Sequence, residues 1–86
     1  MTTIEEIITA IDQTIEKITE ATGASAGAGA KTDRALNNAA ALGVTGPVEG
    51  LTAIQVALAE LSTRLAGAST DAQQARDTAQ AVAENT

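Results

Sequence analysis

The sequence predicts an all-α protein, a long antiparallel helical hairpin with helices over about 3–42 and 48–84 and a turn at 43–47. Small and aliphatic residues recur at alternating steps of three and four in both halves, which places them on one face of an α-helix. Twenty of the 86 residues are alanine, which favours helix over strand. The single proline lies between the two halves, beside a glycine. We therefore expect one helical domain over residues 1–86.

The composition allows only a thin core. The chain contains no aromatic residue, no histidine and no cysteine, and its large aliphatic residues are seven isoleucines, six leucines, four valines and one methionine. Such a set suits long thin helices better than a sheet sandwich. It also lacks the aromatic anchors that are common in protein cores and binding hot spots.

The ends of both helices have recognisable signals. Thr3 and Glu6 fit a capping box ahead of the isoleucine-rich run. Gly43 suits the left-handed position after a first helix that ends at Leu42. Pro47 suits the first turn of a second helix, where the acidic side chain of Glu49 interacts favourably with the helix dipole.

The heptad spacing suggests how the helices pair. The positions expected to face each other are, in the first helix, Ile4, Ile7, Ile11, Thr14, Ile18, Ala21, Ser25, Ala28, Thr32, Ala35, Ala39 and Leu42, and in the second, Leu51, Ile54, Leu58, Leu61, Leu65, Ala68, Ala72, Ala75, Ala79 and Val82. Folding the chain between Leu42 and Leu51 pairs residues whose numbers add up to 93. Large then faces small in most layers, as close packing requires.

Two glycine-containing segments leave an alternative open. The stretch 23–30 contains three glycines, and Gly67 lies almost opposite in this register. Either both helices continue and small residues let the backbones approach closely, or both break and form four short helices. Unbroken heptad spacing favours continuous helices with a kink near Gly27 and Gly67.

A further apolar line suggests an interface. Ile8, Ile15 and Leu36 lie beside the expected seam, where one hairpin would leave them uncovered. A second hairpin would cover them and form a four-helix bundle. Val44 and Val48 flank the turn and are possible docking contacts in a polymer or complex. The candidate interface residues are therefore Ile8, Ile15, Leu36, Val44 and Val48.

Other functions are disfavoured by the residues themselves. A net charge of −6 without a basic stripe argues against nucleic-acid binding. Asp12, Glu16 and Glu20 recur on one helix face, but this is typical of a solvated face rather than a metal site. The segment 23–32 does not match a P-loop, because Ser25 and Ala30 occupy its glycine positions. No serine has an activating base. We expect no catalytic residue, cofactor, metal or small-molecule substrate, and hence no enzyme.

The predicted location follows from the same sequence. The acidic start of the chain does not resemble a signal peptide, and no apolar run has membrane-spanning length. We expect a cytoplasmic protein, or one exported by a route that needs no signal peptide, without nucleic-acid or membrane partners.

Two families show a resemblance. The capped acidic start, the alanine-rich hairpin and the turn sequence of residues 42–50 (LGVTGPVEG) resemble a family of small uncharacterised actinobacterial proteins, a domain of unknown function. Size and topology also resemble the WXG100 (ESX-type) hairpins, with Val44-Thr45-Gly46 in place of their Trp-x-Gly turn. Gly46-Pro47 is similar to the turn of secretion-needle subunits. Together these features favour a helical module that self-associates or binds a helical partner; the alternatives are a subunit of a filament or needle and an adaptor of a secreted protein.

Overall fold

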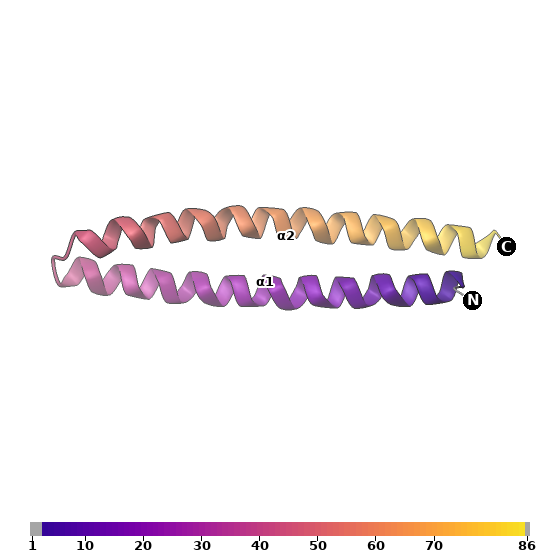
Figure 1. Cartoon of the computed structure of the whole chain (residues 1–86), viewed down its shortest axis with the longest axis horizontal. Helices are drawn as coiled ribbons and strands as arrows, with labels where there is room; N and C mark the ends of the chain where they lie inside the picture. The colour runs from indigo at the N-terminus through magenta and orange to yellow at the C-terminus, as the bar shows by residue number, and fades with distance from the viewer. Residues whose placement is uncertain (1–2, 86) are drawn as a thin grey trace.

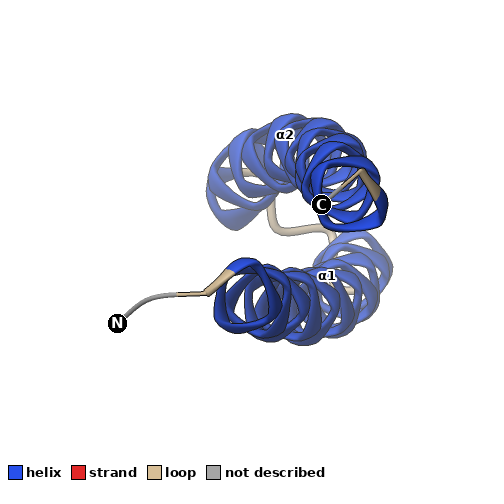
Figure 2. Cartoon of the chain, turned by 90° about the vertical axis from the view of Figure 1, so that its right-hand side faces the viewer, coloured by secondary structure: helices blue, strands red, loops and turns tan. Residues whose placement is uncertain are grey.

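The computed structural model describes residues 3–85 and confirms an all-α helical hairpin. Helix α1 spans Ile4–Ala41 and helix α2 spans Gly46–Glu84. They lie side by side in an elongated molecule of 65 × 16 × 15 Å, with both chain ends at the end opposite the turn (Figure 1). Viewed end-on, the helices are inclined to one another rather than strictly parallel (Figure 2).

The caps of α1 follow the sequence signals. The backbone N–H of Glu6 donates to the Thr3 hydroxyl oxygen at 3.2 Å, which satisfies one free amide of the first turn. At the other end Gly43 has a φ of +71°, which a glycine adopts without strain. The N–H groups of Val44 and Gly43 then donate to the carbonyls of Ala39 and Ala40, each at 3.1 Å. This Schellman motif ends the helix.

The turn is shorter than the sequence suggested. Helix α2 begins at Gly46, one residue before Pro47, which lies in the first turn of the helix as expected. Residues 42–45 alone connect the helices. The midpoint of the hairpin therefore lies between residues 43 and 44, about three residues earlier than predicted.

This shift makes the predicted register wrong. The hydroxyls of Ser25 and Ser62 lie 3.4 Å apart, and these residue numbers add up to 87. Two further cross-helix hydrogen bonds join residues whose numbers add up to 88, Asp33 with Gln55 and Asp12 with Arg76. Residues at the same level of the hairpin therefore add up to about 87, and not to 93.

The new register changes which side chains lie between the helices, a region we call the seam. On α1 the seam line is Ile4, Ile8, Ile11, Ile15, Ile18, Thr22, Ser25, Gly29, Thr32, Leu36 and Ala39. On α2 it is Val48, Leu51, Gln55, Leu58, Ser62, Leu65, Ser69, Ala72, Arg76, Ala79 and Ala83. All except Thr22 and Ser62 are buried or half-buried. Half of the predicted α1 positions lie on the seam line. The other half, every seventh residue from Ile7 to Leu42, lies outside the seam, because the two helices meet in a different register.

Both helices run without interruption through the glycine segments, so the alternative of four short helices is wrong. The ribbons curve gradually and show no sharp kink (Figure 1). The expected close approach of the backbones is also absent. A Cβ atom placed on Gly23, Gly27, Gly29 or Gly67 would meet no atom within 4 Å.

The seam forms a thin core. Within residues 3–85 only Ser25, Thr32 and Ala39 are buried, and the described part has no fully buried large side chain. The hydroxyl of Thr32 donates to the carbonyl of Ala28 at 2.8 Å, so this buried polar group is satisfied within its own helix. Small and polar residues thus occupy the most protected positions.

Candidate interaction surface

The two helices leave two long edges on the hairpin, one on each side of the seam. Both helices are right-handed and they run antiparallel. Residues one position after a seam residue therefore lie on the same side of the hairpin in α1 and in α2, and residues one position before a seam residue lie on the other side. One such edge contains Asp12, Thr19, Ala26 and Asp33 of α1 with Thr52, Ala66 and Gln73 of α2. We call it the polar edge. A shallow groove of about 490 Å³ that both Thr19 and Ala66 line agrees with this placement.

Two side-chain bridges connect the helices along the polar edge. Arg76 Nε donates to Asp12 Oδ1 at 2.5 Å, and Gln55 Nε2 donates to Asp33 Oδ1. The hydrogen bond and then the negative charge of Asp12 raise the pKa of Arg76, so the guanidinium stays protonated. These bridges place two polar side chains of α2, Gln55 and Arg76, on the seam line.

The sequence argument missed both bridges. It assigned Asp12 to a solvated face with Glu16 and Glu20, whereas the structure turns Asp12 toward α2 and leaves it half-buried. A signal was present, because Asp12 with Arg76 and Asp33 with Gln55 fit one common register. Identifying that register required the true position of the turn.

The opposite side of the hairpin is the apolar edge. Its residues on α1 are Ile7, Thr14, Ala21, Ala28, Ala35 and Leu42, and on α2 they are Ile54, Leu61, Ala68, Ala75 and Val82. No charged residue is present among these positions. They repeat at a spacing of seven on both helices, so the edge is a continuous strip along the molecule.

Large aliphatic side chains on this edge are open to solvent. Within residues 3–85, seven large hydrophobic residues are at least 40% exposed, and five of them lie on the apolar edge. The five are Ile7 (40%), Leu42 (78%), Ile54 (47%), Leu61 (42%) and Val82 (45%). The other two are Val44 in the turn and Val56 on the outer face of α2. Concentration on one side distinguishes this strip from the scattered apolar residues of ordinary surfaces.

The candidate interface residues from the sequence lie elsewhere. Ile8, Ile15 and Leu36 are half-buried on the seam line, where α2 of the same chain covers them in part. Val48 is half-buried as well, at the level of Ala39. Only Val44 is exposed, at 42%. The expectation that Ile8, Ile15 and Leu36 lie outside the seam is wrong, because the register brings the line through Ile8 inward and the line through Ile7 outward.

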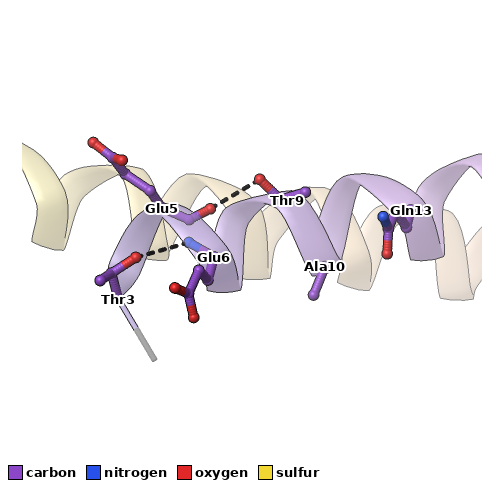
Figure 3. A pocket seen from close by; sticks show the side chains of 6 residues that line it. All are labelled: Thr3, Glu5, Glu6, Thr9, Ala10 and Gln13. Carbon is purple, nitrogen blue, oxygen red and sulfur yellow. Dashed lines mark hydrogen bonds between the residues drawn. The ribbon is translucent and has the colours of Figure 1, made fainter. Parts of the chain in front are cut away.

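The remaining surface offers little for chemistry. A depression near the start of α1 is lined by Thr3, Glu5, Glu6, Thr9, Ala10 and Gln13, all of them exposed side chains of a single helix region (Figure 3). Its hydrogen bonds are the cap from Glu6 to Thr3 and the Thr9 hydroxyl donating to the carbonyl of Glu5. Groups of three or more acidic residues that could hold a metal ion do not occur between residues 3 and 85. The segment 23–32 is continuous helix, not a phosphate-binding loop.

Over the described residues, neither helix has the length and apolar character together that crossing a membrane requires. Comparison with models of protein families, with curated proteins and with solved structures found no match. The resemblances to the actinobacterial family and to the WXG100 hairpins therefore stay predictions.

Proposed function

We propose that this protein is a non-enzymatic helical assembly module, which acts by placing its hairpin against a copy of itself or against a helical partner. The observation that carries the proposal is the apolar edge, where five large aliphatic side chains are exposed on one side of the molecule. Exposed apolar strips of this kind are typical of protein interaction sites.

The thin seam supports the same proposal. The seam spacing of alternating three and four residues is that of a short antiparallel coiled coil. The seam line includes the polar residues Gln55, Ser62, Ser69 and Arg76, and within residues 3–85 it has no fully buried large side chain. Small domains with so little core commonly gain stability by association.

The direct test is the association state over a wide concentration range. Sedimentation equilibrium and thermal melts by circular dichroism, from micromolar to millimolar protein, should show a rising mass and a rising melting temperature. A chain that stays monomeric throughout, with a melting temperature independent of concentration, would contradict the self-associating form. Binding to a helical partner would then be the remaining form of the proposal.

A second candidate function, the subunit of a filament or needle-like polymer, is favoured by the turn. Leu42 is 78% exposed and Val44 is 42% exposed, so an apolar contact could form at the tip of the hairpin. A contact between unlike surfaces that does not close generates a filament. Changing Leu42 and Val44 to Ser should then abolish large assemblies seen by negative-stain imaging while helicity persists. Unchanged assemblies in that variant would remove this candidate.

A further inference from the structure

We propose that a second copy of this chain covers the apolar edge, in a dimer whose two-fold axis runs along the length of the hairpin. Both turns then lie at the same end, and α1 of each copy lies beside α2 of the other. This inference rests on the proposed assembly function and specifies its partner, its surface and its geometry.

The exposed area is of the size that a dimer buries. The chain has a solvent-accessible surface of 6014 Å². A compact monomer of 8.6 kDa would expose about 4,700 Å². Each partner of a stable interface buries about 600–1,000 Å², so the excess of about 1,300 Å² per chain is enough for one such contact. The chain therefore exposes enough surface for one further hairpin along the apolar edge.

The apolar edge is complementary to itself in this arrangement. A two-fold axis along the hairpin keeps each residue at its own level, so the edge positions that meet have numbers that add up to 89. Ala28 then meets the partner's Leu61, and Ala35 meets the partner's Ile54. Nearer the chain ends, Ile7 meets the partner's Val82. Large side chains face small ones near the turn, as tight packing of neighbouring helices requires.

Small residues fill the middle of the same edge. Ala21 meets the partner's Ala68, and Thr14 meets the partner's Ala75 in this geometry. The corresponding side chains are exposed in the single hairpin, so nothing in the chain itself blocks the approach of a second copy. Each of these layers occurs twice around the axis, because the contact uses the same surface of both copies.

The charges beside the apolar edge select this orientation. Lys17 and Asp71 border the edge on α1 and α2 at nearly the same level, so Lys17 of each copy lies beside the partner's Asp71. The ion pair of Lys17 with Glu20 spans 3.6 Å between largely exposed side chains and is readily exchanged. The opposite orientation, with the turns at opposite ends, brings Lys17 near the partner's Lys31 and Arg64 near the partner's Arg64. Like charges make that orientation less favourable.

A matched pair of charge variants tests the surface. Ala21→Glu with Ala68→Glu introduces carboxylates on the apolar edge, and Ala26→Glu with Ala66→Glu introduces the same number on the polar edge. All four alanines are exposed helix positions. Sedimentation equilibrium should show that the dissociation constant of the dimer rises at least about 100-fold in the first variant, because unpaired carboxylates would be buried. In the second variant the dissociation constant should change by less than about threefold, because the substitutions stay on the exposed surface.

The possible results separate the two proposals. A wild-type dimer that both variants leave intact would overturn the apolar edge as the interface while the assembly function stands. A wild-type chain that is monomeric at millimolar concentration would overturn the dimer, and the assembly function would then rest on a different helical partner.

Cysteine cross-linking tests the orientation of the two copies in the dimer, independently of the charge variants. The chain has no native cysteine, so single substitutions report one position each. A mixture of Lys17→Cys and Asp71→Cys chains should form the mixed disulfide faster than either forms a disulfide with itself. Arg64→Cys should form little disulfide with itself. Rapid self-linkage of Arg64→Cys, without the mixed product, would overturn this geometry.

Discussion

The seam and the apolar edge are neighbouring lines on the same two helices, with the same heptad spacing, yet only one lies between the helices. On α1 the adjacent residues Ile7 and Ile8 have the same side chain, and Ile7 is 40% exposed whereas Ile8 is half-buried. On α2 the contrast is sharper, because apolar Ile54 is 47% exposed while polar Gln55 is half-buried beside it. The comparison teaches that register, and not hydrophobicity alone, decides which line faces inward.

Cross-helix hydrogen bonds accompany the inversion on α2. Gln55 and Arg76 lie on the seam line and reach Asp33 and Asp12 on the polar edge. The single hairpin satisfies its polar bridges and leaves aliphatic side chains exposed on the far side.

The largest expected effect comes from locking the register. Ser25→Cys with Ser62→Cys should form an intramolecular disulfide, because the two hydroxyls lie 3.4 Å apart in the seam. Closing a loop of this length should raise the free energy of unfolding by about 4 kcal/mol relative to the reduced form. Denaturant melts of the oxidised and reduced protein measure the difference.

The matched control places the second cysteine according to the register that the sequence suggested. Ser25→Cys with Ala68→Cys should not form an intramolecular disulfide, because Ala68 lies about 1.7 helical turns beyond Ser62, the residue at the level of Ser25. Efficient closure of this control, with none in the Ser62 variant, would show that the helices pair in the other register.

The next prediction compares the seam with the apolar edge by truncating one leucine of α1 on each. Leu36→Ala should lower the free energy of unfolding by about 2 kcal/mol, because Leu36 is half-buried in the seam. Leu42→Ala should change it by less than about 0.5 kcal/mol, because Leu42 is 78% exposed. Chemical denaturation in the oxidised Ser25→Cys, Ser62→Cys background, at low protein concentration, compares the two. A larger loss at Leu42 would reverse the assignment of the lines.

Much of the fold could be predicted from the sequence because local signals specify it. The capping residue Thr3, the left-handed Gly43 and the heptad spacing define two helices and a turn. The register could not be predicted, because the heptad spacing alone does not exclude other pairings. Pairing Leu42 with Leu51 places the midpoint of the hairpin about three residues too late, since α1 ends at Ala41 and α2 already begins at Gly46. On α1 the larger side chains of Ile15 and Leu36, compared with Thr14 and Ala35, do indicate the true seam. On α2 no size rule would place Gln55 inside and Ile54 outside.

The sequence therefore predicted an uncovered apolar line but placed it on the wrong residues. An uncovered apolar line was expected, and the structure has one, but it passes through Ile7, Ile54 and Leu61 instead of Ile8 and Ile15. Assigning it correctly requires knowing which side of each helix the polar bridges occupy. Those bridges are long-range contacts between residues more than twenty positions apart.

An effect of similar size, in the opposite direction, should come from the faces that belong to neither line. Gly23, Gly27 and Gly67 are exposed helix-interior residues, and an added Cβ would meet nothing within 4 Å. Changing all three to Ala should raise the free energy of unfolding by about 1.5–3 kcal/mol, since each glycine costs a helix about 0.5–1 kcal/mol. Thermal melts measure the gain. A loss of stability would mean that these glycines are needed for a contact that the hairpin itself lacks.

The smallest effect concerns the bridge that holds the polar edge closed. Arg76→Met removes the hydrogen bond to Asp12 and keeps most of the aliphatic stem, so it should lower the free energy of unfolding only slightly, because the pair is partly exposed. The loss should shrink in 1 M salt, where the Debye length is about 3 Å. Arg64→Met, at an exposed position, is the control and should change stability less. Combining Arg76→Met with Asp12→Asn should cost little more than either change alone, because both remove one interaction. If the two losses of stability simply added up, Arg76 and Asp12 would not interact. The register would then rest on the contact between Ser25 and Ser62.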